Sequence, residues 1–522
     1  MKYPLFIFCF VTMLLSCSEK KEAKRIPLTS TSKDAIENYN QGVFRDEQLE
    51  SDEASSYFKK ALELDSNFAM AKIYFNDKTD PASNKKRLVE AYNNRASLSE
   101  IESVIVAVTY ETTINNDFAK SDLMMDSLIK KYPDYYELYL SSADIKNMLN
   151  KTEDCLHRYK ESLEVNPECY AAALSIPNLH TTAGNGFSKF SMLPIEKRNI
   201  EEAEKYFNLA AKIRPNAPAT SRMYGNLYRA KADLDKALAK YEESINLNTE
   251  KTSLYSTSLL MVGHISLAKG EYDKSREFYQ KARSASKNGS NGIVSLTTFE
   301  ILTYLYEKKY DEVISQCNTL LSKIDSLPES EYRKNNFKAY IEYLKFITYG
   351  HSLKEQETLE SISKIDNYRA EITKSDIEKS VDNNEIINIQ NKAKSQNLSN
   401  YILYNILFAH YEEAEKKLKE LESVLSETLK KNPTAMDDFY KFSGYLSLME
   451  GKVKESVDFY KKVVKGLDED TYDYYFYGLA LKAQGNKVES DQIFTKITKN
   501  YFVQWQIAIV KELAKAQLNA SN

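Results

Sequence analysis

Small, apolar and aromatic residues recur along this chain at positions i, i+4 and i+7, the spacing that places them on one face of an α-helix. Ala203, Phe207 and Ala210 form one such set. Short stretches of this kind, about twelve of them, alternate with turns that contain Pro, Asn or Gly. With only 14 Gly and 11 Pro in 522 residues, the pattern predicts an all-α protein.

The helical stretches also repeat at a fixed interval along the chain. Residues of the same kind separated by this interval are Gly444 and Gly478, Gly451 and Gly485, Ser456 and Ser490, Tyr460 and Phe494, and Pro133 and Pro167. The interval, about 34 residues, is the length of a helix–turn–helix unit that stacks into a solenoid. An unrelated helical bundle would also contain short helices, but the fixed interval favours the solenoid.

The markers of each unit resemble those of the tetratricopeptide repeat (TPR) family. The residues that carry this resemblance are Gly42, Ala54, Phe58 and Ala61; Gly225, Tyr228, Ala237 and Tyr241; and Gly263, Gly270, Tyr279 and Ala282. A small residue at each helix crossing lets two backbones approach, and an aromatic ring fills the space beside it. The resemblance implies a TPR-type α-solenoid of antiparallel helix pairs, about 10–12 pairs plus a C-terminal capping helix.

Two interruptions of the period suggest how the chain is divided. We expect an N-terminal array over residues 33–365, a degenerate repeat or exposed linker over 366–400, a C-terminal array over 401–500 and a capping helix in 501–522, which holds the lone Trp505. Pro167 and Pro215 are further apart than one interval, so an insertion lies near residues 184–196. An apolar insertion of this kind either packs on its neighbours or contributes to a binding site.

Residues 1–16 have the character of an export signal. Lys2 precedes an uncharged apolar stretch from Tyr3 to Leu15 that is too short to span a bilayer comfortably. Leu14-Leu15-Ser16-Cys17 resembles the bacterial lipobox, which implies acylation of Cys17 and a lipid anchor. Ser18 in place of Asp favours the outer over the inner membrane in lipoproteins of this kind. Residues 17–32 are then expected to be a flexible tether.

Three cysteines remain in the body after the signal segment and Cys17 are set aside, namely Cys155, Cys169 and Cys317. An odd number does not support a disulfide framework. Cys155 and Cys169 are placed at opposite ends of one predicted helix, about 20 Å apart, which is too far for a bond. We expect three free, buried thiols.

Composition and motifs argue against several classes of function. The 71 Lys and Arg are balanced by 75 Asp and Glu, so there is no basic excess for nucleic-acid binding. The five His are dispersed, and no metal, nucleotide or nucleophile-elbow motif occurs. The repeats leave no room for a separate catalytic domain. We expect no enzyme activity, no cofactor and no metal.

Candidate binding residues follow from placing the first helix of each unit along a concave groove. This places Arg222, Asn226 and Arg229 on the inner face of one helix, with His264 next to them. In the last array the same placement gives Lys441, Tyr445, Tyr472, Tyr475 and Lys482. In some TPR domains a basic residue and an Asn four positions apart help to bind a partner's C-terminal carboxylate, and Arg222 and Asn226 match that pair. Aromatic and cationic groups together suit an extended peptide.

The leading hypothesis is a non-catalytic scaffold, a membrane-anchored TPR lipoprotein that binds protein or peptide partners at the bacterial cell envelope. A SusD-like glycan-binding lipoprotein is an alternative, although sugar platforms usually need exposed Trp and this chain has 1 Trp. An outer-membrane assembly factor is a third possibility that shares the fold of the first. The sequence does not distinguish it from the leading hypothesis.

Overall fold

The computed structural model describes residues 24–77, 81–181, 192–194, 197–287, 289–380, 383–429, 435–463 and 470–520. Within these ranges the protein has 25 α-helices and one short 3₁₀-helix, and no β-strand. Consecutive helices pack as twelve pairs, followed by a single last helix. The predicted all-α solenoid of helix pairs with a C-terminal capping helix is confirmed.

The pairs are α1 (Lys33–Glu47) with α2 (Ser51–Leu64), α3 (Ala69–Tyr74) with α4 (Pro81–Asn93), α5 (Glu100–Thr113) with α6 (Phe118–Lys131), α7 (Tyr136–Met148) with α8 (Thr152–Val165), α9 (Tyr170–His180) with α10 (Ile200–Ile213), and α11 (Pro218–Ala230) with α12 (Leu234–Leu247). They continue as α13 (Ser253–Ala268) with α14 (Tyr272–Ala285), α15 (Gly289–Tyr306) with α16 (Tyr310–Ile324), α17 (Glu331–His351) with α18 (Glu355–Glu378), α19 (Asn383–Leu407) with α20 (Tyr411–Leu429), α21 (Asp437–Met449) with α22 (Val453–Tyr460), and α23 (Thr471–Ala483) with α24 (Lys487–Thr498). The capping helix is α25 (Trp505–Asn519).

Each well-formed pair crosses where a glycine of the first helix meets an aromatic ring sixteen residues later. The glycine and ring pairs are Gly42 with Phe58, Gly225 with Tyr241, Gly263 with Tyr279, Gly444 with Tyr460, and Gly478 with Phe494. A Cβ atom built on any of these glycines would lie 2.4–2.8 Å from the ring, closer than van der Waals contact allows. The predicted crossing of small and aromatic residues is therefore the packing unit of the array.

The turn inside ten of the twelve pairs contains one residue in the left-handed region of backbone conformation. These residues are Leu49, Asn116, Asn150, Ala232, Gly270, Lys308, Leu353, Ala409, Gly451 and Gly485. In the turn after α17, the Lys354 N–H donates to the Tyr349 carbonyl at 3.0 Å, which satisfies a terminal carbonyl of the helix. The turn geometry is uniform along the array even though its residues differ.

Leu353 offers a test of this turn, because it has φ 58° and its side chain is 74% exposed. A left-handed conformation costs an L-residue about 1–2 kcal/mol, and Gly loses about 0.5–1 kcal/mol more backbone entropy on folding. We expect Leu353→Gly to raise the free energy of unfolding by about 0.5–1 kcal/mol. Chemical denaturation measures the change. Gly451→Ala is the matched reverse substitution, and a stabilising effect of that change would contradict the argument.

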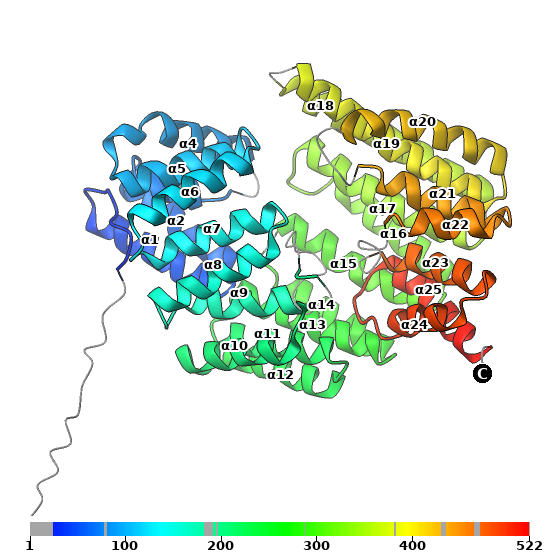
Figure 1. Ribbon diagram of the computed structural model, residues 1–522, viewed down its shortest axis with the longest axis horizontal. Helices are drawn as coiled ribbons and strands as arrows, with labels where there is room; N and C mark the ends of the chain where they lie inside the picture. The colour runs from blue at the N-terminus through cyan, green and yellow to red at the C-terminus, as the bar shows by residue number, and fades with distance from the viewer. Residues whose placement is uncertain are drawn as a thin grey trace, which may run out of the picture.

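The array bends back on itself (Figure 1). Helices α1–α6 lie at one end of the long axis, whereas α17–α20 and, below them in this view, α21–α25 lie toward the other end, where α25 packs against α15. The Tyr306 hydroxyl donates to the Phe502 carbonyl at 3.1 Å, and the Lys308 ammonium donates to the Ala508 carbonyl at 2.7 Å. These bonds attach the capping helix and the residues before it to the turn between α15 and α16.

The first pair is held against the middle of the array in a similar way. The Glu53 carboxylate accepts the Ser253 N–H at 3.1 Å and the Ser253 hydroxyl at 2.7 Å, at the beginning of α13. Glu47, at the end of α1, forms an ion pair with Arg214 before α11. A carboxylate at a helix N-terminus satisfies exposed amides and interacts favourably with the helix dipole. The N-terminal array therefore closes into a tight turn.

Two expectations about the ends of the arrays need correction. Residues 24–32, expected to be part of a flexible tether, lie against the body. Their contacts are the ion pairs of Lys24 with Asp134 at 2.7 Å and Arg25 with Glu137 at 2.9 Å, and the hydrogen bond from the Thr29 N–H to Glu102 at 2.7 Å. For residues 366–400 the sequence left open a degenerate repeat or an exposed linker, and the exposed linker is the alternative that the structure contradicts. Where the structure describes them, they form the end of α18 and most of α19, which belong to consecutive pairs.

The remaining expectations about this part of the chain have mixed outcomes. Cys155, Cys169 and Cys317 are free and buried, as predicted. Cys169 does not share a helix with Cys155, because it is the N-cap of α9 whereas Cys155 lies in α8. Most of the insertion at residues 184–196, and Cys17 with the signal segment, lie outside the described residues. Leu193 is buried, and its N–H donates to the Leu179 carbonyl at 3.0 Å.

Candidate functional site

Asn226 and His264 lie on the side of α11 and α13 that was expected to form the groove, but both are buried. Asn226 Oδ1 accepts a hydrogen bond from the Tyr241 hydroxyl at 2.7 Å, and His264 Nδ1 pairs with the Tyr279 hydroxyl at 2.8 Å. Each side chain is therefore the hydrogen-bond partner of the tyrosine hydroxyl whose ring packs against the glycine of the same helix pair. Their assignment as ligand-binding residues is wrong, because a buried phenol needs a hydrogen-bond partner inside the protein.

Arg222 lies one helical turn before Asn226 and is only partly buried. Its Nε atom has no hydrogen-bond partner among the described residues, and none of their carboxylates forms an ion pair with it. Burial lowers the pKa of Arg222, and the positive charge of Arg229 lowers it further. A guanidinium that is enclosed without a counter-charge is costly. Arg222 is therefore the predicted binding residue that remains available to an anion.

Arg229 lies two turns further along α11 and is buried. Its guanidinium stacks on the ring of Phe502 at 4.8 Å. Phe502 belongs to the extended residues before α25, so this face of α11 looks toward the returning C-terminal segment. We call the face of the N-terminal array marked by Arg222 and Arg229 the inner face.

Burial, together with the positive charges of Arg229 and Arg222, favours the neutral form of His264. Burial lowers the pKa of His264 well below 6.5, and the charges of Arg229 and Arg222 lower it further. The cluster thus consists of two guanidinium groups and a neutral imidazole, with an aromatic ring from Phe502 at one side. Of these groups, the Arg222 guanidinium has the chemistry to pair with a carboxylate or another oxyanion, since guanidinium donors match the geometry of such anions.

The five residues expected to line a groove in the last array are not available there. Tyr445, Tyr472 and Tyr475 are buried, and Tyr472 packs against Trp505 with ring centroids 5.4 Å apart. The Lys441 ammonium is 3.3 Å from Asp470, and Lys482 donates to Gln517 of α25 at 3.0 Å. The expectation is wrong because the capping helix and neighbouring acids cover this side.

The structure adds inner-face residues that the sequence reasoning missed. Asp144 occupies the position of Asn226 in an earlier pair and accepts a hydrogen bond from the Tyr159 hydroxyl at 2.6 Å. Desolvation, with a smaller contribution from the charge of Asp46, raises the pKa of Asp144 to about 6, although solvent still reaches the carboxyl group. The position directly after the small residue at a helix crossing was the sequence signal that could have identified Asp144. It marks Asp144, Asn226 and His264 alike.

His351, at the end of α17, makes the stability of the fold depend on pH on the side that the capping helix covers. Its Nε2 atom is buried without a hydrogen-bond partner among the described residues, and its ring packs on Tyr472. Burial, with a smaller effect of the nearby Lys308 charge, lowers the pKa of His351 from 6.5 to about 4. A lowered histidine pKa means that stability is fully present above pH 6.5 and is lost as the pH falls toward about 4.

We therefore expect His351→Phe to remove part of the acid sensitivity of the fold. The difference in unfolding free energy between the variant and the natural protein should shift by about 2–3 kcal/mol in favour of the variant between neutral pH and pH about 4. Thermal unfolding across this range measures it. His157→Phe is the control, since the His157 side chain is 72% exposed. Equal pH dependence in the two variants would contradict the assignment.

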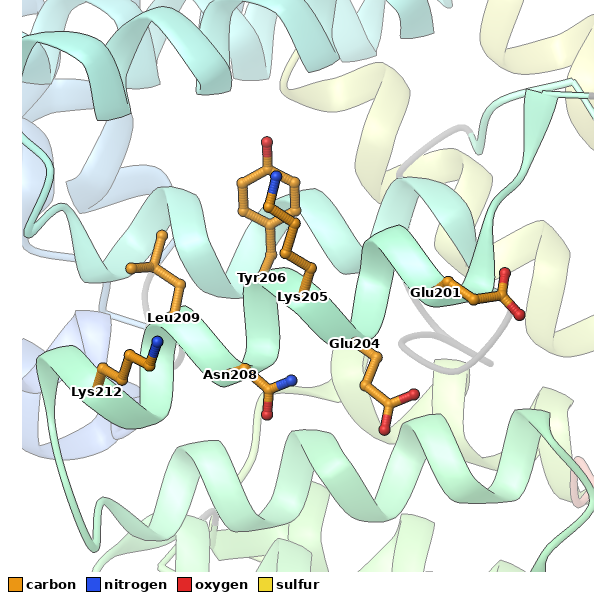
Figure 2. Close-up of a pocket in the computed structure, with 7 residues that line it drawn as sticks. All are labelled: Glu201, Glu204, Lys205, Tyr206, Asn208, Leu209 and Lys212. Atoms are coloured by element: carbon orange, nitrogen blue, oxygen red, sulfur yellow. The ribbon is translucent and has the colours of Figure 1, made fainter.

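A hollow of about 530 Å³ lies on the solvent side of α10. Its lining residues all come from this one helix, and Figure 2 shows their side chains fanning outward rather than converging. A second hollow, of about 420 Å³, lies between α18 and α19 and contains Arg369, whose guanidinium donates to Asn397 at 2.9 Å. The first hollow is formed by one helix alone, and in the second the Asp366 carboxylate already accepts a hydrogen bond from the Tyr401 hydroxyl at 3.0 Å, so the inner face remains the better candidate.

Other kinds of site were sought in the described part of the chain. None of its His, Cys, Asp and Glu side chains form a group of three or more suited to a metal ion. None of the helices described there has the length and apolar character needed to cross a membrane.

Comparison with known proteins agrees with the repeat geometry. Residues 256–288, which include most of α13 and all of α14, match the family model of the tetratricopeptide repeat. This match identifies a tetratricopeptide repeat in that part of the chain, and such repeats generally mediate protein–protein interactions. Among solved structures, a tetratricopeptide repeat protein from Parabacteroides merdae is 11% identical, with a TM-score of 0.33. The match covers 59% of this chain and 99% of that chain.

Proposed function

We propose that this protein is a non-catalytic scaffold that binds a peptide or protein partner on the inner face of its N-terminal array. The partner contributes a carboxylate, from an acidic side chain or a C-terminus, which pairs with Arg222. The body is held at the bacterial cell envelope by acylated Cys17, at the outer rather than the inner membrane, as Ser18 favours.

The unpaired guanidinium of Arg222 is the observation that supports this proposal. Neighbouring cations are neutralised within the protein, as Arg214 is by Glu47 and Lys231 is by Glu204. A partner carboxylate would supply the counter-charge that the described residues do not give Arg222. The Phe502 ring of this chain lies over Arg229 at 4.8 Å, a contact of the kind that an aromatic side chain of an extended partner would make.

Binding of model peptides tests the proposed partner chemistry. Fluorescence anisotropy on residues 17–522 would compare acidic peptides, in free-acid and C-terminally amidated form, with sequence-matched peptides carrying Gln and Asn. We expect Arg222→Gln to weaken binding of the acidic peptides about tenfold or more, because a desolvated charge loses its partner. Lys441→Gln, whose lysine is already paired with Asp470, is the control. Equal binding of acidic and neutral peptides would rule out the proposal.

The anchor is tested separately. We expect the protein from bacterial membranes to carry a diacylglyceryl modification on Cys17, visible by mass spectrometry, and Cys17→Ser to release the body into the aqueous phase of a detergent partition. Membrane fractionation then reports whether the anchored protein is in the outer membrane. An unmodified N-terminus that begins at another residue would refute the anchor without affecting the peptide-binding result.

The alternative of a glycan-binding lipoprotein finds no support in the described residues. Trp505, the single tryptophan, packs between Tyr343 and Tyr472 at centroid distances of 6.1 and 5.4 Å. It is therefore not an exposed platform for a sugar ring. An envelope-assembly factor would use the same inner face as the proposed scaffold, and the peptide experiment bears on both.

A further inference from the structure

The segment before α1 is docked on the body along most of its described length. Ile26 donates its N–H to Glu137 at 3.0 Å, the Thr29 N–H donates to Glu102 at 2.7 Å, and the Ser30 hydroxyl donates to Asp65 at 2.6 Å. Ile26 and Leu28 also pack against the core of the first pairs. We call residues 24–32 the strap. It crosses the beginnings of α5 and α7 before the chain enters α1.

Because the strap is docked, the chain leaves the body at Lys24 and not at the beginning of α1. Lys24 lies beside the turn between α6 and α7, where it pairs with Asp134 at 2.7 Å and its backbone bridges to Tyr135. Seven residue steps separate Cys17 from Lys24. Even fully extended, they span about 25 Å. An undocked segment from Cys17 to Ser32 would span about 50 Å.

The surface around this exit point carries lysine and tyrosine side chains together with two acids, because Lys24 pairs with Asp134 at 2.7 Å and Lys131 pairs with Glu100 at 2.6 Å. Lys24 lies over the Tyr135 ring at 5.9 Å, and Lys131 lies over the Tyr132 ring at 5.4 Å. The two rings are in contact, with centroids 6.2 Å apart, and Lys130 is exposed beside them. Tyrosine and lysine side chains suit the headgroup region of a bilayer, where the ring is partly buried and the ammonium meets lipid phosphates.

We propose that this exit face, formed by Lys24, Lys130, Lys131, Tyr132 and Tyr135, rests against the lipid headgroups of the membrane. The inference rests on the proposed anchor at Cys17, and it adds an orientation to that anchor. The short connection holds the α6–α7 turn close to the bilayer. Helices α23 and α24, at the opposite end of the long axis in Figure 1, then lie away from the bilayer.

Energy transfer from a labelled body to a lipid acceptor tests the orientation. The protein would begin with a hexahistidine directly before Ser18 and be captured on vesicles of phosphatidylcholine, phosphatidylglycerol, a nickel-chelating lipid and a fluorescent acceptor lipid. This capture does not depend on acylation in the cell. The donor dye is placed on Ser127→Cys in α6 or on Val488→Cys in α24, both exposed positions, while the three native cysteines are buried.

We expect energy transfer from position 127 to be at least about twice that from position 488. A connection of about 25 Å keeps the exit face close to the lipid. A flexible Gly-Ser insertion of about twenty residues before Lys24 should reduce the difference. Lys130→Glu with Lys131→Glu should lower the transfer at 127, since anionic lipids then repel the face. Equal transfer at the two positions in the short-tether protein would overturn the proposal, whatever the outcome for acylation of Cys17.

Discussion

Arg222→Met is expected to stabilise the protein by about 1–2 kcal/mol while removing its affinity for acidic peptides. The arginine is partly buried without a counter-charge among the described residues, so the folded state bears a desolvation cost that methionine does not. Methionine preserves much of the packing of the aliphatic part of the side chain. Chemical denaturation and peptide anisotropy on the same preparation measure the two effects.

Arg214→Met provides the matched control for this result. Arg214 precedes the same helix, but it pairs with Glu47 and stacks on the Tyr170 ring at 4.3 Å. Removing Arg214 leaves a carboxylate without its partner, and we expect the free energy of unfolding to fall by about 1–3 kcal/mol. The two substitutions should thus change stability in opposite directions. Destabilisation by Arg222→Met similar to that of Arg214→Met would mean that Arg222 has a structural role instead.

Gly225→Ala is expected to destabilise the protein by about 2–3 kcal/mol or more, because the added methyl overpacks the helix crossing. Its carbon would lie 2.4 Å from the Tyr241 ring. The ring is fully buried, and its hydroxyl is held by Asn226, so it cannot move aside without losing that hydrogen bond. The change should shift the thermal unfolding midpoint downward, as followed by circular dichroism at a helix-sensitive wavelength.

Two further variants separate overpacking from other causes. At Gly350 the added carbon would lie 2.9 Å from the end of the Leu407 side chain, which is a flexible group. Gly350→Ala should therefore lower the free energy of unfolding by less than Gly225→Ala does. In Gly225→Ala with Tyr241→Leu the clash is removed, and the double variant should be more stable than the sum of the single effects indicates. Strict additivity of the two changes would show that the ring is not what excludes the methyl group.

The proposed peptide site and the proposed exit face both belong to the N-terminal array, which would fix the position of one relative to the other. The strap, the first pair and the beginning of α13 are joined by carboxylates that cap backbone amides, as Glu102 does for Thr29 and Glu53 does for Ser253. A body fixed in this way presents Arg222 at a constant orientation to the membrane. A partner bound there would be held at a defined place relative to the bilayer.

The repeat architecture followed from the sequence because its determinants are local. A small residue and an aromatic ring sixteen positions later identify a crossing whichever pair they belong to, as Gly42 with Phe58 and Gly478 with Phe494 show. For Tyr159, Tyr241 and Tyr279, the hydrogen-bond partner of the ring hydroxyl also has a fixed offset, one residue after the small position. The boundaries between arrays were less predictable, since the longer helices α18 and α19 conceal the repeat markers within a continuous helical pattern.

The binding residues were predicted less well because their accessibility depends on contacts between distant pairs. Lys482 and Tyr472 occupy positions that would face a groove in an isolated pair, yet α25 covers them through Gln517 and Trp505. Nothing in the local pattern around residue 482 shows that the last helix folds back. Arg222 and Lys441 have similar surroundings in sequence, and they differ only because Asp470 lies close to the lysine in space.

The sequence by itself determined the helix pairs and the crossings between them, since each depends on residues within one or two repeats. Only the tertiary structure decided which inner-face charges are neutralised, which side the capping helix covers and where the strap leaves the body. Those outcomes depend on the bend accumulated over twelve pairs, to which every interface contributes a small rotation. No pattern within one repeat encodes the sum of these rotations.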